Sequence, residues 1–281
     1  VSGGWRDFER NDLHIVEVPP GQISRARSRY GDRGFGPVAA GIYIGFNLKR
    51  FPDVRLRQAV SLALDRDEIS HSIYDDTLRP AQGIIPEGLS GRDPEACAEF
   101  CEKNLARAKA LVKEAFPQGP PEIKFNYQQG PPHDAVARSL QQSLAEIGIK
   151  LIPQPQELGS FFDTLDKEEQ DIFRLGWVAE YPLADWFIEP LFRGGSPDNH
   201  TGYTVAEVDE LMKKARSEPD RRSRQRLYRS LESRLTKELA LIPVGHFRNH
   251  YAAQRYVHGF YVDQVGGFEI AKLEFRADQN N

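Results

Sequence analysis

Residues 174–181 bring together side chains that can hold a small charged molecule. Glu180 and Arg174 carry opposite charges, and both can form strong, charge-assisted hydrogen bonds. Trp177 offers a flat apolar surface, and Tyr181 adds a ring with a hydroxyl group. These residue types are suited to binding rather than to bond making. A structural interpretation competes with this one: Glu180 and Arg174 form an internal ion pair, while the two aromatic residues pack in the core.

Histidines at positions 246 and 250 have the spacing H-x-x-x-H, which on a helix would bring two imidazoles together for a metal. Their neighbours, Pro243, Gly245 and alternating apolar residues, predict a strand instead. In a strand, positions four apart lie about 13 Å from each other, too far for one metal to bridge. Ser90 lacks a nucleophile elbow, and no glycine pattern matches a dinucleotide fingerprint. We therefore expect no catalytic residue, no metal site and no cofactor.

Cys97 and Cys101 are the two cysteines of the chain. On a regular helix their side chains would share a face in poor geometry for a disulfide, whereas an irregular loop could close the bond easily. A metal pair and two free thiols are the alternatives. The metal pair has less support, because no second pair of Cys or His residues lies nearby in the sequence.

Length and composition describe an ordinary globular chain. Its 281 residues can form one large or two modest domains, and 40% are hydrophobic against 28% charged. The net charge of -4 and the pI near 6.0 argue against a nucleic-acid surface. No apolar run approaches the roughly 20 residues that a membrane-spanning helix needs.

Residues 43–69 predict a strand followed by two capped helices. The strand covers residues 43–48 and ends before Pro52, and Asp53 is placed to cap the first helix. Asp65 can cap the second. The buried face of the first helix is predicted by apolar residues at helical spacing: Leu56, Ala59, Val60, Ala63 and Leu64.

The remaining pattern indicates an α/β fold. Residues 122–153 read as strand, helix and strand, which is the pattern of a right-handed βαβ unit and predicts a partly parallel sheet. Helices are predicted at 161–165 and 205–215 and along Leu227, Leu231 and Leu235. Strands are predicted at 13–18, 171–177, 241–247 and 268–275. The arginine- and glycine-rich stretch up to Gly36 is predicted to be a loop.

Several of these segments resemble one protein family. The sequences FN at 46, DVR at 53, RQA at 57 and ALDR at 63 closely resemble the signature of the bacterial family-5 extracellular solute-binding proteins, the peptide and nickel receptors of ABC importers. GWVAEYP at 176–182 resembles the G-W-x-A-D-Y segment of that family. The resemblance continues in order over roughly residues 12–268, and the stretch from Cys97 to Cys101 interrupts it.

The resemblance implies a type II periplasmic-binding-protein-like α/β fold, mainly the second lobe with a mixed sheet plus partial segments of the first lobe. We expect a first-lobe segment at 1–41, the ligand-binding lobe at 42–238 and a return segment at 239–281. Members of the family are substantially longer, so we expect the chain to be a fragment. The late strands would then lack most of their partners.

The resemblance also implies a function and a ligand site. Glu180 matches an acidic residue that pairs with the ligand's α-ammonium group, although the family pattern has Asp there, and Arg174 matches a residue that in some members helps to hold the ligand's carboxylate. Trp177 and Tyr181 would complete the site. The expected role is an extracytoplasmic receptor that binds short peptides between two lobes and delivers them to permease subunits.

Other ligands and other functions stay open at this point. Nickel chelates, oligosaccharides or other small solutes are alternative ligands, and a hydrolase or a non-transport sensor is an alternative function. The expected location is the periplasm or the extracytoplasmic face of the membrane, reached through the transporter or a lipid anchor. That compartment favours the disulfide between Cys97 and Cys101.

Overall fold

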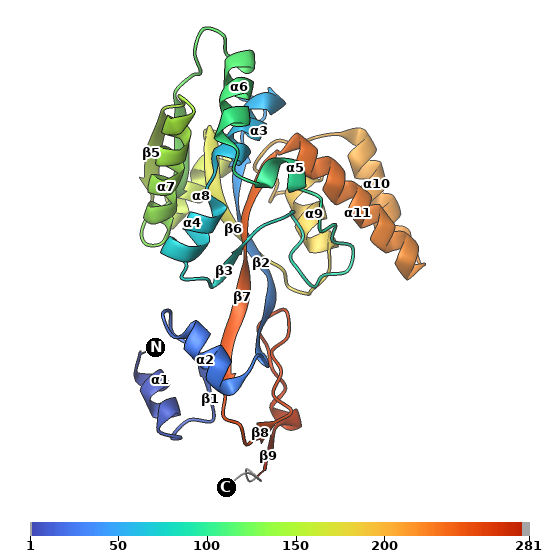
Figure 1. Ribbon diagram of the computed structural model, residues 1–281. Helices are drawn as coiled ribbons and strands as arrows, with labels where there is room; N and C mark the ends of the chain where they lie inside the picture. Colours follow the sequence, from blue (N-terminus) through green and yellow to red (C-terminus); the bar gives the residue numbers. More distant parts are fainter. Residues whose placement is uncertain (1, 277–281) are drawn as a thin grey trace.

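A seven-stranded mixed sheet runs through the computed structural model, which describes residues 2–276 (Figure 1). Its strands are ordered β1-β7-β2-β6-β4-β5, and β3 also pairs with β7. The larger part of the molecule contains β3 to β6, the helices α3 to α11, and the adjoining halves of β2 and β7. The smaller part contains α1, β1, α2, β8 and β9. We call the stretch where β2 and β7 pass between the two parts the waist.

The elements have these bounds along the chain: α1 Ser2–Glu9, β1 Ile15–Glu17, α2 Ile23–Tyr30, β2 Gly34–Phe46, α3 Val54–Ala63, α4 Arg66–Glu68, η1 Ile69–Ile73, β3 Leu78–Pro80, α5 Ala98–Cys101, α6 Leu105–Ala115, β4 Ile123–Gln128, α7 His133–Glu146, β5 Leu151–Gln156, α8 Leu158–Asp166, β6 Ile172–Val178, α9 Asp185–Phe192, α10 Ala206–Ser217, α11 Arg221–Glu238, β7 Leu241–Ala253, β8 Val257–His258, η2 Ile270–Lys272 and β9 Glu274–Phe275.

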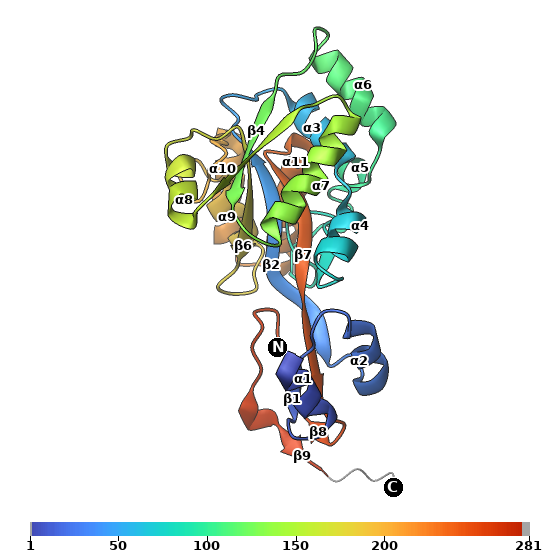
Figure 2. The same ribbon diagram turned by 90° about the vertical axis from the view of Figure 1, so that its left-hand side faces the viewer.

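Helices cover both faces of the sheet in the larger part (Figure 2). One face packs against α3, α6 and α7 in a core that includes Phe46, Phe125 and Leu140. The other face packs against α8 to α11 around Phe161, Phe173 and others. An α/β fold with a mixed sheet is what the sequence predicted. No helix in residues 2–276 is both long enough and apolar enough to cross a membrane.

The predicted strand and capped helices at residues 43–69 are confirmed. The Asp53 side chain accepts a hydrogen bond from the backbone N–H of Arg55 (2.9 Å), and the Asp65 side chain accepts one from that of Glu68 (2.9 Å). These bonds satisfy N–H groups that have no partner inside the helix. The βαβ unit is also confirmed, since β4 and β5 pair in parallel around α7.

Three local predictions are wrong. The stretch predicted as a loop contains α2, whose Ala26 and Tyr30 lie one helical turn apart and pack against Trp5 and Phe8. The predicted strand at 268–275 is reduced to β9, because much of the stretch lies on the surface, with Ile270 75% exposed.

The late strand β7 also does not lack partners, because it pairs with β2 on one edge and with β1 and β3 on the other. The predicted boundary at 41/42 falls inside β2. The division of the chain into three segments stays a prediction.

The chain between β3 and α5 is held against α11 by a buried carboxyl group. Glu232 is fully buried, and its two oxygens accept hydrogen bonds from the backbone N–H groups of Ile85 (2.7 Å) and Asp93 (2.6 Å). A disulfide joins Cys97 to Cys101 at the end of the same segment, with 5.3 Å between the Cα atoms. An irregular segment without a sheet or helix ladder is thereby fixed at several points.

We predict that β2 tolerates a methyl group at one glycine and not at another. A Cβ at Gly45 would overlap the buried ring of Phe173, whereas a Cβ at Gly36 would meet nothing within 4 Å. Gly45→Ala should lower the free energy of unfolding by about 1–3 kcal/mol. The control Gly36→Ala should change it by less than about 1 kcal/mol in either direction. Urea unfolding of both variants measures the difference, and equal effects would contradict the packing described for β2.

We also predict that stability falls as the pH rises through the range where Glu232 ionises. Burial raises the pKa of Glu232 to about 8, so the folded protein keeps a proton that the unfolded chain has already lost. The free energy of unfolding should therefore fall between pH 6.5 and 8.5, by roughly 2 kcal/mol. This pH range lies above the range in which folded His246 titrates, because burial lowers the pKa of His246 to about 4.

Urea unfolding at the two pH values tests this. Glu232→Gln should remove most of the slope, while the control Glu210→Gln, at an exposed position of α10, should keep it. An unchanged slope in Glu232→Gln would assign the pH dependence to other groups.

Candidate functional site

Three parallel strands point toward the waist. β6 is antiparallel to β2, which rises from the smaller part, so its last residue, Val178, pairs with Ala40 just above the waist. β4 is parallel to both β6 and β5, so all three point the same way. Ligands of α/β proteins bind outside the carboxyl ends of such strands. The residues that follow these strands are therefore the first place to look for a ligand site.

A cavity of about 450 Å³ lies at the waist, between the two parts of the molecule. Arg27 and Phe35 of the smaller part line one side of it, and Asp76 and Thr77, after η1, line the other. The backbone N–H of Thr77 donates to the carbonyl of Tyr74 (3.0 Å). The hydroxyl of Tyr74 accepts a hydrogen bond from Arg174, but neither of these two residues lines this cavity.

Arg174 of β6 is a buried cation without an anion. Its side chain is on the sheet face of α7, and the residue is only 7% exposed. One guanidinium nitrogen lies 2.7 Å from Nδ1 of His133, at the start of α7, and another donates to the hydroxyl of Tyr74 (2.9 Å). Its Nε is buried without a hydrogen-bond partner. Among residues 2–276 no ion pair of Arg174 is found.

The other buried arginines show what a structural role looks like. Arg57 donates to three backbone carbonyls, those of Glu238, Phe51 and Pro52. Arg66 donates to the carbonyls of Pro243, Ser61 and Cys101 and to the hydroxyl of Ser61. Carbonyl oxygens satisfy a buried guanidinium, so both arginines brace the fold. Arg174 differs, because its partners are a histidine and a tyrosine and one of its donors is unused.

His133 is kept neutral beside Arg174. Burial lowers the pKa of His133, and the positive charge of Arg174 lowers it further. A neutral imidazole can accept a hydrogen bond through Nδ1, and the guanidinium can only donate. The positive charge of the group therefore stays on Arg174. Sequence reasoning missed both His133 and Tyr74; the position of His133 after the first strand of the βαβ unit was the available signal.

Trp177 lies on the opposite face of the sheet from Arg174. Its indole N–H donates to the carbonyl of Trp186 (2.6 Å), and its ring borders a recess of only about 20 Å³ with Tyr43 and Phe187. Tyr181 is 44% exposed, and its ring meets that of Trp186 edge-on at 5.2 Å. Trp177 therefore packs beneath the segment that follows β6. Tyr181 belongs to that segment, and its ring is exposed.

Glu180 is exposed beyond the end of β6, and the competing interpretation, an internal ion pair with Arg174, is not found within residues 2–276. Arg174 lies six residues before Glu180 in the sequence. Its side chain points to the face of the sheet where His133 and Tyr74 lie. Within the described residues, no ion pair of Glu180 is found either. The structure thus leaves both charges available, and it does not gather the four predicted residues around one point.

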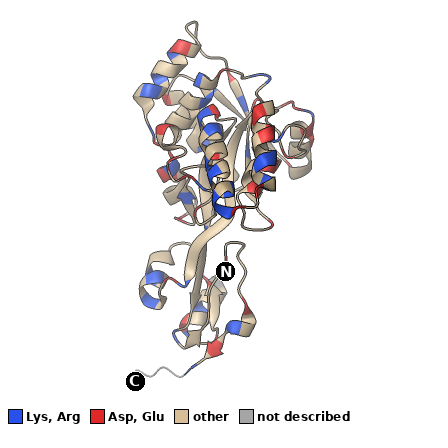
Figure 3. Ribbon diagram, turned by 90° about the vertical axis from the view of Figure 1, so that its right-hand side faces the viewer, with Lys and Arg blue, Asp and Glu red and all other residues tan. Residues whose placement is uncertain are grey.

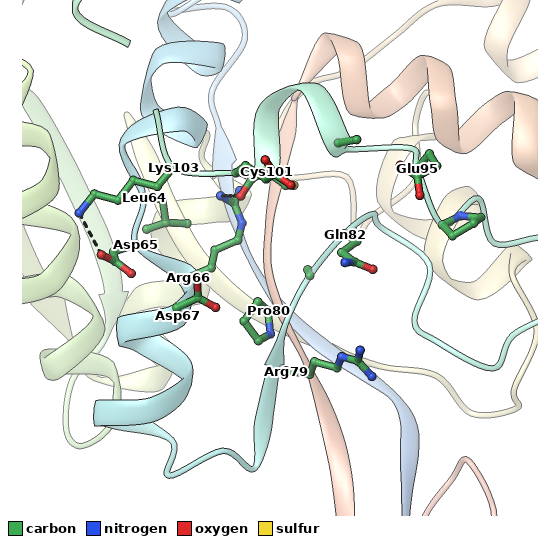
Figure 4. Close-up of a pocket in the computed structure, with 14 residues that line it drawn as sticks. Leu64, Asp65, Arg66, Asp67, Arg79, Pro80, Gln82, Glu95, Cys101 and Lys103 are labelled. Atoms are coloured by element: carbon green, nitrogen blue, oxygen red, sulfur yellow. Dashed lines mark hydrogen bonds and ion pairs between the residues drawn. The ribbon is translucent and has the colours of Figure 1, made fainter. Parts of the chain in front are cut away.

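A larger cavity than that at the waist, about 710 Å³, lies elsewhere, between β3, α4 and α5 (Figure 4). Asp65 and Lys103 form an ion pair at its edge (2.9 Å), and none of the four predicted site residues lines it. His246 and His250 both lie on β7, as the strand prediction required. In the described part of the chain no cluster of three or more His, Cys, Asp or Glu residues is arranged to hold a metal ion.

Comparison with known proteins identifies similar chains. Residues 5–199 match the model of the middle region of the bacterial extracellular solute-binding proteins, family 5. The dipeptide-binding protein DppE of Bacillus subtilis is 25% identical over 82% of this chain and 45% of its own length. The periplasmic oligopeptide-binding protein OppA of Escherichia coli is 29% identical over 75% and 40%. The chain spans about half the length of the curated relatives it matches.

Solved structures agree on the fold. HbpA2 of Haemophilus parasuis superposes with a TM-score of 0.88 at 23% identity, over 98% of this chain and 56% of the other. The periplasmic binding protein DppA of Helicobacter pylori, in complex with the peptide STSA, gives a TM-score of 0.71 at 19% identity, over 98% and 55%. Both establish a periplasmic-binding-protein fold that covers part of the longer proteins.

We predict that Arg174 controls the protonation of His133. Arg174→Met should raise the pKa of His133, because the variant removes a neighbouring positive charge while burial remains. The imidazole resonances of His133 can be followed by NMR from pH 4 to 8, with the other histidines as internal references. An unchanged or lowered pKa would mean that the two side chains are not in contact in solution.

Proposed function

The chain belongs to family 5 of the bacterial extracellular solute-binding proteins, and we propose that it forms the ligand-contacting part of a receptor for short peptides. The receptor would deliver them to the permease subunits of an ABC importer. One observation carries this proposal: Arg174 is a buried, hydrogen-bonded cation for which residues 2–276 supply no anion. We propose that the carboxylate of a bound peptide is held beside this guanidinium.

An unpaired buried cation is costly unless a partner arrives. Removing a charge from water carries a penalty that only a counter-charge or several good hydrogen bonds offset. Arg174 has two such bonds and an unused Nε donor, so a carboxylate beside it would gain a charge-assisted hydrogen bond at little cost in ordering. A peptide's terminal carboxylate is the simplest such group, and Tyr74 and His133 hold the guanidinium in place for it.

Glu180 is the proposed partner of the ligand's ammonium group. It is six residues from Arg174, which limits the separation of their Cα atoms to roughly 20 Å. Both side chains reach beyond their Cα atoms, and an extended peptide rises about 3.3 Å per residue, so this separation is compatible with a short peptide held at both ends. Tyr181, exposed beside Glu180, would contact the ligand's first side chains, and Trp177 would fix the segment from behind.

The finer points of the role are proposals of the same kind. We place the receptor on the extracytoplasmic face, in the periplasm or held there by a lipid anchor, with the ligand enclosed when two lobes close at the waist. The segments 1–41 and 239–281 would belong to the first lobe and 42–238 to the second. The relatives named above are binding proteins for dipeptides and oligopeptides, which favours a peptide over a chelate or a sugar. Nothing in the site favours a hydrolase.

A test uses peptides with blocked ends. Ala-Ala-Ala, its C-terminal amide and its N-acetyl form can be compared by saturation-transfer NMR, which detects millimolar binding. The amide should bind the chain about tenfold or more weakly than the free acid, because it loses a charge-assisted bond. Arg174→Met should lose this discrimination and keep that between the free and acetylated amine. Glu180→Gln should do the reverse.

Glu210→Gln, an exposed change on α10, serves as the control and should behave like the parent chain. Equal binding of acid and amide would exclude Arg174 as the carboxylate site. If neither end matters and saturable binding persists, the ligand is held in another way.

A further inference from the structure

A second recess lies close to the segment that carries Glu180. It has a volume of about 350 Å³ and is formed where the start of α9, the end of α10 and the first turns of α11 meet. Its lining combines apolar walls with cations, chiefly Leu183, Tyr228, Arg216, Arg221 and Arg224. The lining begins three residues after Glu180, and the ring of Tyr181 packs on Trp186, the neighbour of the lining residue Asp185.

The cations of this recess are incompletely neutralised. Arg216 pairs with Glu189 (3.1 Å), and Arg224 donates to the backbone carbonyl of Glu218 (2.9 Å). Among the residues that the structure describes, no ion pair of Arg221 or Arg224 is found. Asp185 is the one acidic side chain in the lining, against three arginines. A guanidinium held by a single carbonyl keeps donors free for a carboxylate.

The surroundings strengthen the positive potential. Residues 221–231 of α11 contain five arginines and no acidic residue, in a chain whose net charge is -4 (Figure 3). Arg222 and Arg226 lie one turn apart on the exposed face, which is mildly unfavourable for the isolated helix. Such a concentration of one sign raises the local concentration of anions.

We propose that this recess, which we call the arginine pocket, binds a carboxylate carried on a short apolar stem. The carboxylate would meet Arg221 and Arg224, and the stem would pack on Leu183 and Tyr228. Two sources share this chemistry: the acidic side chain of a peptide whose ammonium group is held by Glu180, and a free dicarboxylic acid. The first source rests on the proposed function and would make the receptor selective for peptides with Glu near the amino terminus. The second does not depend on it.

The test compares ligands that differ in one charge. Glu-Ala-Ala and Gln-Ala-Ala have nearly the same size, and glutarate represents the free acid. Binding to the chain is followed by saturation-transfer NMR at low ionic strength. The Glu peptide should bind about tenfold more tightly than the Gln peptide, equivalent to about 1.4 kcal/mol. The preference should be absent in Arg221→Gln/Arg224→Gln.

A matched control separates the pocket from the general charge of α11. Arg222→Gln/Arg226→Gln removes the same charge from the same helix at positions that do not line the pocket, and should keep most of the preference. Because Arg224 also holds the end of α10, Arg221→Gln alone provides a second variant that leaves that bond intact. Thermal unfolding checks that all variants remain folded.

Each possible outcome of this test either supports or overturns the proposed carboxylate site. The proposal would be overturned if the pocket variants still preferred Glu-Ala-Ala over Gln-Ala-Ala. It would also be overturned if Arg222→Gln/Arg226→Gln lowered this preference as much as the pocket variants do, because the effect would then come from the general charge of α11. Glutarate binding that is lost only in the pocket variants, without any peptide preference, would support the pocket with a free acid as its ligand. If no peptide binds at all, the proposed function fails while glutarate still tests the pocket. If neither glutarate nor the Glu peptide shows pocket-dependent binding, the pocket is not a carboxylate site.

Discussion

The pairing of β2 with β7 is the constraint on which the rest of the structure depends. The two strands form an antiparallel ladder from Gly34 opposite Tyr251 to Gly45 opposite Leu241, and in the described chain they alone run through both parts. The ladder passes close to neighbouring side chains, so glycine is required where β2 meets Phe173 and His246. It also sets the direction of β6, and with it the place where β4, β5 and β6 end. The location proposed for the ligand follows from that direction rather than from any single residue.

The three buried arginines show how the same side chain serves opposite purposes. Arg57 and Arg66 are surrounded by backbone carbonyls, which no ligand can displace without breaking the fold. Arg174 is surrounded by side chains, which leave part of its hydrogen-bonding capacity unused. In Arg57 and Arg66 the guanidinium groups stabilise the fold by binding backbone carbonyls. The arrangement around Arg174 leaves hydrogen-bonding capacity for a partner, and the hydrogen bonds to a tyrosine and a neutral histidine offset only part of the cost of burying the charge.

Local patterns were enough to predict most of the fold and only part of the site. The caps at Asp53 and Asp65 and the βαβ unit depend on residues close in sequence, so their spacing predicts them. The α2 helix was missed because its buried face consists of only two residues among many arginines. The contact of Arg174 with Tyr74 and His133 joins positions up to 100 residues apart. It depends on the register of β6 against its neighbours, which no short motif encodes.

Arg174 and Glu180, the two charges proposed to hold the ligand, differ in burial. This difference predicts that they contribute to binding in different ways. Arg174 is buried between the sheet and α7 and is fixed by hydrogen bonds to His133 and Tyr74. A carboxylate can therefore bind it in few orientations. Glu180 is exposed on a segment without regular structure, where its side chain keeps more freedom and its charge is screened by water. The longer side chain of Glu, in place of the Asp of the family pattern, is easily accommodated there. We infer that ligand length is accommodated at the amine end and that the carboxylate end supplies most of the affinity, because desolvated charges interact more strongly than exposed ones.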